Sequence, residues 1–241
     1  MEIVLNVINI IGIISFAAAG AMVAIDNETD FFGVVFLSVI TCFGGGMLRD
    51  IIAGQTIGRE IPAFFTDFNL EIIICILTAC LVFFLAAAFK HHYVKDEAKV
   101  EQINNILDAL GIGVFSAAGT AAYIGEGPLV AIVLGMISSI GGSITRDVIL
   151  RQIPVILRKR IYALACLFGS GVYYVVAKFI IPDTDTTNVI ATVCCVVVIF
   201  AIRMCATVFK WNMPRAIDFR KLRAEQKAEE QAKEAEENLK V

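Results

Sequence analysis

Residues 42–50 read Cys42-Phe43-Gly44-Gly45-Gly46-Met47-Leu48-Arg49-Asp50 and follow directly on the apolar run 31–41. Glycine in a helix interior costs about 0.8–1.0 kcal/mol relative to alanine, so three in succession weaken a helix locally. An arginine and an aspartate are equally poor material for continuing an apolar segment. The stretch therefore marks a weak, charged point in an apolar helix, and its meaning depends on what surrounds that helix.

The composition indicates a membrane protein. Of the 241 residues, 58% are hydrophobic and 18% charged, and the mean hydropathy is +0.79. Soluble domains average about 45–50% apolar and about 25% charged residues. Several apolar runs reach about 20 residues, the length that spans a bilayer core of about 30 Å. These runs are too long for barrel strands and lack strict alternation, so we expect an all-α integral membrane protein.

Seven membrane-spanning helices are predicted, at residues 3–24, 32–53, 70–89, 103–124, 129–150, 161–181 and 189–209. The first begins without a basic region or a cleavage site, which indicates a membrane helix and not a cleaved signal. Basic residues gather in the loops after the third and fifth spans and in the C-terminal tail. The positive-inside rule then places the N-terminus outside and the C-terminus in the cytoplasm of a cell-membrane protein.

The glycine motif occurs twice, which indicates an internal repeat. Gly44–Asp50 matches Gly141–Asp147, and the pattern Gly12, Phe16, Gly20 recurs as Gly111, Phe115, Gly119. Each copy holds three spans, and because three is odd the second copy crosses the membrane in the opposite direction. We predict a first repeat at 1–97, an inverted second repeat at 98–185, a seventh helix at 186–212 and a charged cytoplasmic tail at 213–241. Such inverted repeats point to a transport pathway at their interface.

The doubled motif supplies the candidate pathway residues. In lipid, irregular backbone is tolerated only against protein or a water-filled cavity, and exposed carbonyl oxygens suit a cation. We expect a broken or kinked helix in each repeat, with the kinks at Gly44, Gly45, Gly46, Gly141, Gly142 and Ser143. The alternative is close packing of two unbroken helices, for which small residues are also used.

The charged residues of the two motifs are candidates for fixed charges near the pathway ends or for internal ion pairs: Arg49, Asp50, Arg146 and Asp147. The alternative is that the arginines snorkel to the membrane surface. For Arg203, in the seventh span, we expect a snorkelling or lipid-phosphate contact. The basic cluster Arg151, Arg158, Lys159 and Arg160 either binds anionic lipid headgroups or only sets the topology.

Two copies of the pattern G-G-[GS]-x-x-R-D, each in the middle span of a three-helix repeat, resemble the prokaryotic branch of the trimeric intracellular cation (TRIC) channels, also called the glycine transporter domain family. The resemblance covers roughly residues 10–209. It implies a seven-helix protomer, a homotrimer, and a pore in each protomer lined by the kinked second and fifth helices. It also implies conduction of monovalent cations, chiefly K⁺ and with Na⁺ as a further candidate. Ser143 departs from the glycine pattern and softens the second kink.

Two other functional classes remain open. One is a secondary transporter of a small solute such as glycine, in which the repeats rock in alternating access. The other is a membrane scaffold without transport, which explains packing glycines but not the repeated Arg-Asp pair. No Ser-His-Asp set, phosphate loop or metal-ligand cluster is found in the sequence, so we expect neither an enzyme nor a metal or other cofactor, and no nucleic-acid partner. The seven cysteines are expected to be free thiols.

Overall fold

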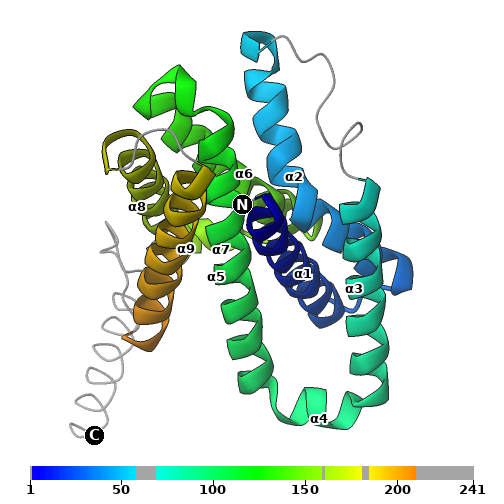
Figure 1. The fold of residues 1–241 in the computed structure, drawn as a ribbon. Helices are drawn as coiled ribbons and strands as arrows, with labels where there is room; N and C mark the ends of the chain where they lie inside the picture. Colours follow the sequence, from blue (N-terminus) through cyan, green and yellow to red (C-terminus); the bar gives the residue numbers. More distant parts are fainter. Residues whose placement is uncertain (1, 58–68, 159–160, 181–184, 210–241) are drawn as a thin grey trace, which may run out of the picture. The chain divides into compact units, whose positions relative to one another are not determined.

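The computed structural model describes residues 2–57, 69–158, 161–180 and 185–209, and this part of the chain is helical without strands (Figure 1). The long helices are α1 (Glu2–Asp26), α2 (Phe31–Ile57), α3 (Asn69–Ala88), α5 (Glu97–Ala122), α6 (Pro128–Ile149), α8 (Ile161–Val175) and α9 (Asp185–Val208). The described part also contains four short helical elements: α4 (Lys90–Lys95), η2 (Ile124–Glu126), α7 (Val155–Arg158) and the π-helical end of α8, η3 (Val176–Ile180).

Among the described residues, seven helices are long and apolar enough to cross a membrane, which confirms the predicted number of spans. Their ends differ from the predicted ones where polar residues continue a helix. The fourth span was predicted to begin at residue 103, whereas α5 begins at Glu97. Hydropathy marks the part of a helix that lies in lipid, and helical hydrogen bonding continues beyond it.

The helices form two inverted three-helix repeats and a seventh helix. The first repeat is α1, α2 and α3, and the second is α5, α6 and α8. Equivalent helices of the two repeats pack together, α1 against α5 and α2 against α6, while α9 packs against α5 and α8. The first two helices of each repeat therefore face their counterparts in the other repeat.

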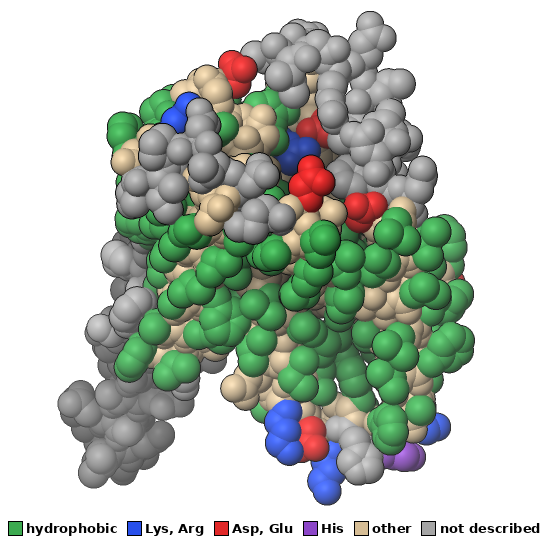
Figure 2. Space-filling view, in the orientation of Figure 1, with side chains coloured by type: hydrophobic (Ala, Val, Ile, Leu, Met, Phe, Trp, Pro, Cys, Tyr) green, Lys and Arg blue, Asp and Glu red, His purple; other side chains and the backbone are tan. Residues whose placement is uncertain are grey.

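The surface agrees with a membrane setting. On the face shown in Figure 2, hydrophobic side chains cover the middle of the helices, and charged side chains gather at the two ends. Large apolar residues on the helices are widely exposed, among them Ile51, Ile73, Leu77 and Phe179. A surface of this kind is suited to contact with acyl chains.

Candidate functional site

The glycine motifs lie where α2 crosses α6. A Cβ atom at Gly45 would collide with the carbonyl oxygen of Ser138, and one at Gly142 would collide with that of Thr41. A Cβ at Gly141 would lie 2.9 Å from the Cα of Gly45. The two backbones approach so closely that only glycine fits at these positions.

Neither helix is interrupted at its glycines, so the two helices are not broken there, and the kinks expected at these glycines stay a prediction. α2 is helical from Phe31 to Ile57 and α6 from Pro128 to Ile149. In Figure 1 the ribbon of α2 changes direction between its two ends while remaining helical. Close packing, the alternative reading of the glycines, describes most of the motif. Gly46 differs, because its nearest neighbour for a Cβ is the Arg49 guanidinium at 3.8 Å.

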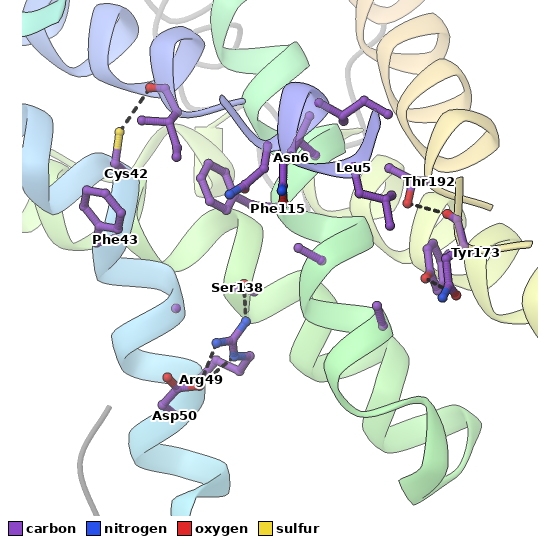
Figure 3. A pocket seen from close by; sticks show the side chains of 18 of the residues that line it. Leu5, Asn6, Cys42, Phe43, Arg49, Asp50, Phe115, Ser138, Tyr173 and Thr192 are labelled. Atoms are coloured by element: carbon purple, nitrogen blue, oxygen red, sulfur yellow. Dashed lines mark hydrogen bonds and ion pairs between the residues drawn. The ribbon is translucent and has the colours of Figure 1, made fainter. Parts of the chain in front are cut away.

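A first cavity of about 400 Å³ lies beside the crossing. Residues of α1, α2, α5, α6, α8 and α9 line it. Its polar wall is formed by Asn6, Asn9, Arg49, Asp50, Ser138, Tyr173, Asn188 and Thr192. Gly46 also lines it, unlike the other motif glycines. Figure 3 shows the guanidinium of Arg49 reaching from α2 toward Ser138 on α6.

Arg49 and Asp50 form an internal ion pair in the wall of this cavity. The Nη2 atom of Arg49 lies 2.7 Å from Oδ1 of Asp50, and the two side chains are 13% and 7% exposed. Nη1 donates to the Ser138 hydroxyl at 3.2 Å, and the guanidinium lies 5.9 Å from the centre of the Tyr123 ring. The arginine therefore links α2 to α6 instead of snorkelling to the membrane surface.

A second cavity of about 360 Å³ holds the matching pair. Its polar wall is formed by Asp26, Asn27, Glu101, Asn104, Asn105, Asp108, Arg146, Asp147, Gln152 and Tyr162. Nη2 of Arg146 lies 2.8 Å from Oδ1 of Asp147, and these side chains are 4% and 3% exposed. Oδ2 of Asp147 accepts a hydrogen bond from the backbone N–H of Val155 at 2.9 Å, which fixes the start of α7.

The two cavities approach the crossing from opposite ends of the helices. On α1 the first cavity contacts residues 5–13 and the second contacts residues 23–27. On α5 the order is reversed, with 114–121 in the first cavity and 101–108 in the second. The two cavities are therefore related to each other as the two inverted repeats are, and each cavity holds one Arg-Asp pair.

The repeat extends further toward the start of each copy than the sequence motifs alone suggested. At the same offset of 99 residues that relates Gly12 to Gly111, Asn6 matches Asn105 and Asn9 matches Asp108. Each pair contributes one residue to each cavity. Sequence reasoning missed these four residues. Their signal was a pair of polar residues three and six positions before the first glycine of the Gly-Phe-Gly pattern in both copies.

Arg203 is the second correction to the sequence reading, because its side chain is buried against the second repeat and paired there. It is 6% exposed, its Nη2 donates to Oδ2 of Asp108 at 2.8 Å, and its guanidinium lies 3.9 Å above the ring of Tyr162. The partner was hidden from sequence reasoning because it lies 95 residues away on another helix. α9 therefore places the buried guanidinium of Arg203 against the second repeat.

The remaining predicted residues do not join either cavity. Ser143 is buried on α6, and Arg151 is exposed just after that helix. The side chain of Arg158, together with Lys159, Arg160 and the tail 213–241, lies outside the described residues. Within the described part, no group of three or more His, Cys, Asp or Glu side chains is placed to hold a metal ion.

Comparison with known proteins finds a family model described as "Glycine transporter", which matches residues 6–87 and 105–178. The chain is 34% identical over 182 residues to a UPF0126 membrane protein of Deinococcus radiodurans, covering 74% of this chain and 79% of that one. It is 34% identical over 169 residues to the UPF0126 inner membrane protein YadS of Escherichia coli K12, covering 69% and 75%.

Two solved structures share the fold over nearly their whole length. A prokaryotic TRIC channel crystallised in 0.5 M KCl has a TM-score of 0.73 and 26% identity, covering 88% of this chain and all of the other (100%). The TRIC trimeric intracellular cation channel orthologue from Rhodobacter sphaeroides has a TM-score of 0.71 and 28% identity, covering 86% and 99%.

Proposed function

Because the chain belongs to the glycine transporter family, the TRIC family that its doubled motif resembles, we propose that it is a K⁺-permeable monovalent cation channel with one pathway inside each protomer. The TRIC channels that share its fold at 26% and 28% identity support this assignment. The protein is a multi-pass membrane protein with seven apolar helices.

The observation that carries the proposal is the pair of cavities, each with polar and charged side chains in its wall, that approach one helix crossing from opposite ends. In the proposed pathway, an ion enters one cavity, passes the α2–α6 crossing and leaves through the other. Polar side chains in both walls replace part of the hydration shell, as side-chain and carbonyl oxygens do in other ion pathways. Because the two cavities are separated only by the crossing, the ion loses its hydration shell over a short part of the pathway, which limits the free-energy cost of dehydration.

The residues of the two motifs have different roles in this proposal. The glycines Gly44, Gly45, Gly141 and Gly142 permit the close crossing, and Gly46 leaves room beside the first cavity. Ser143 adds a hydroxyl on α6 near the crossing. The pairs Arg49–Asp50 and Arg146–Asp147 act as fixed charges, one pair in each cavity, and hold the cavity walls in place.

We further propose a homotrimer in the inner membrane, with the N-terminus outside, the C-terminus in the cytoplasm, and the first cavity open to the outside. The trimer is supported by the name of the Rhodobacter sphaeroides structure and the membrane by the name of YadS. The orientation rests on the basic loops and tail. Anionic lipid headgroups are the proposed contact of the cluster that begins at Arg151.

The test is the recording of purified protein in planar bilayers. In symmetric KCl the proposal requires unitary currents. Under a KCl gradient, the reversal potential must shift from zero toward the equilibrium potential of K⁺. The competing function is a carrier of a small solute such as glycine. Absence of unitary currents, together with accumulation of labelled glycine in proteoliposomes, would establish the carrier and overturn the channel.

A further inference from the structure

Four positions that are polar in both inverted repeats line both cavities, and only one of these four changes its charge. Asn6 and Asn105 are identical, and the Arg-Asp pairs are repeated, but Asn9 of the first cavity is replaced by Asp108 in the second. A neutral amide in one wall therefore corresponds to a carboxylate in the other. A buried carboxylate needs a charge partner or several hydrogen bonds to remain ionised.

The partner comes from the helix that has no counterpart in the repeats. Arg203 of α9 reaches Asp108 with an Nη2–Oδ2 distance of 2.8 Å, at 7% and 14% exposure of the two side chains. Tyr162 stacks under the guanidinium at 3.9 Å and donates its hydroxyl to Oδ1 of Asp108 at 3.1 Å. Asp108 is the residue of α5 that breaks the symmetry of the repeats, and its charge partner, Arg203, comes from α9, which lies outside the repeats.

We propose that Asp108 and Arg203 tune the charge of the second cavity, whose wall also holds the carboxylates of Asp26 and Glu101, and so adjust how strongly permeating cations concentrate there. This inference rests on the proposed channel function. Asp108 lines the cavity, whereas Arg203 lies behind it and acts through Asp108. The carboxylate attracts cations, and the guanidinium limits that attraction.

The sign of each substitution follows from electrostatics. A single elementary charge about 8 Å from an ion in water changes the local ion concentration roughly two-fold. Arg203→Gln leaves the carboxylate unopposed, so K⁺ current entering through the second cavity increases about two-fold in dilute KCl. Asp108→Asn leaves the guanidinium unopposed, so the same current decreases about two-fold. The double variant removes both charges and returns the current close to that of the unmodified protein.

Salt separates this electrostatic role from a structural one. The Debye length falls from about 10 Å at 0.1 M to about 3 Å at 1 M ionic strength, so the changes must disappear in 1 M KCl. A pair that served only to hold α9 would lower the current in both single variants, at both salt concentrations. Arg203→Lys is the matched control, because it keeps the charge while losing the planar stacking on Tyr162.

A variant in the first cavity tests the idea without breaking the buried pair. Asn9 is only partly buried, and Asn9→Asp places a carboxylate at the position equivalent to Asp108. The expected result is about a two-fold increase in K⁺ current entering through the first cavity in dilute KCl, with Asn9→Gln as the neutral control. Unchanged current in Asn9→Asp, or equal losses in both single variants of the pair, overturns the inference. A protein without any unitary current overturns the channel proposal instead.

Discussion

Phe16 and Phe115 stack on one another with ring centroids 5.1 Å apart and an interplanar angle of 14°. They occupy equivalent positions of the two inverted repeats, 99 residues apart. Phe115 also lines the first cavity, and Phe16 is 1% exposed. The pseudo-symmetry of the sequence therefore converges on a stacked aromatic pair between α1 and α5, close to the region that separates the two cavities.

Truncation of this pair tests whether it narrows the proposed pathway. Phe115→Ala removes a partly buried ring from the cavity wall, and we expect a higher unitary conductance because the barrier becomes wider and wetter. Single-channel recording in symmetric KCl measures the effect. Phe32→Ala is the matched control, since Phe32 is 73% exposed on the outer surface of α2. Equal conductance in Phe115→Ala and Phe32→Ala would place the narrow point elsewhere.

The α2–α6 crossing predicts opposite outcomes for neighbouring glycines. Gly45→Ala forces a Cβ against the Ser138 carbonyl oxygen, and overpacking of this kind costs about 1–3 kcal/mol. Gly46→Ala meets only the Arg49 guanidinium, at an ordinary van der Waals distance of 3.8 Å, and gains about 0.8–1.0 kcal/mol of helix propensity. We expect a lower thermal unfolding temperature in detergent for Gly45→Ala and an unchanged or higher one for Gly46→Ala. Similar losses for both would show that the backbone at the crossing is strained for another reason.

The buried pair Arg146–Asp147 predicts strong non-additivity. Removal of one partner of a buried ion pair costs about 3–5 kcal/mol, because the other charge is left without compensation. We therefore expect Arg146→Met and Asp147→Asn each to destabilise the protein, and the double variant to lose less than the sum. Thermal unfolding of the four proteins completes the cycle. The equivalent cycle at Arg49 and Asp50 should give a smaller coupling, since those side chains are 13% and 7% exposed and not 4% and 3%.

Hydropathy and internal repetition were enough to predict seven helices and their arrangement as two inverted repeats. Helix continuity at Gly44 was not predictable, because glycine weakens a helix by an amount that tertiary packing readily offsets, and here the small residue permits the contact with Gly142. The match of Asn9 with Asp108 was visible in the sequence but weak, since it becomes meaningful only when both residues line cavities.

The environment of Arg203 illustrates what a single sequence leaves undetermined. An arginine two turns from the end of a membrane helix satisfies the rules for snorkelling as well as those for an internal ion pair. The difference depends on which face of α9 packs on the repeats, and that is fixed by non-local contacts with α5 and α8. Asp108, its partner, lay in the sequence without any feature that paired the two.

The contact between α4 and the end of α1 predicts a dependence of stability on alkaline pH. The Tyr93 hydroxyl donates to Oδ1 of Asp26 at 3.0 Å, and partial burial, together with the negative charge of Asp26, raises the pKa of Tyr93 above its ordinary value. A raised pKa in the folded state means that the protonated hydroxyl stabilises the fold. This contribution is complete below the ordinary tyrosine pKa of about 10 and is lost as the pH rises above it. We expect the difference in unfolding temperature between the unmodified protein and Tyr93→Phe to be largest at pH 8 and to shrink toward pH 11. A difference that stays constant across this range would show that the hydroxyl makes no proton-dependent contribution.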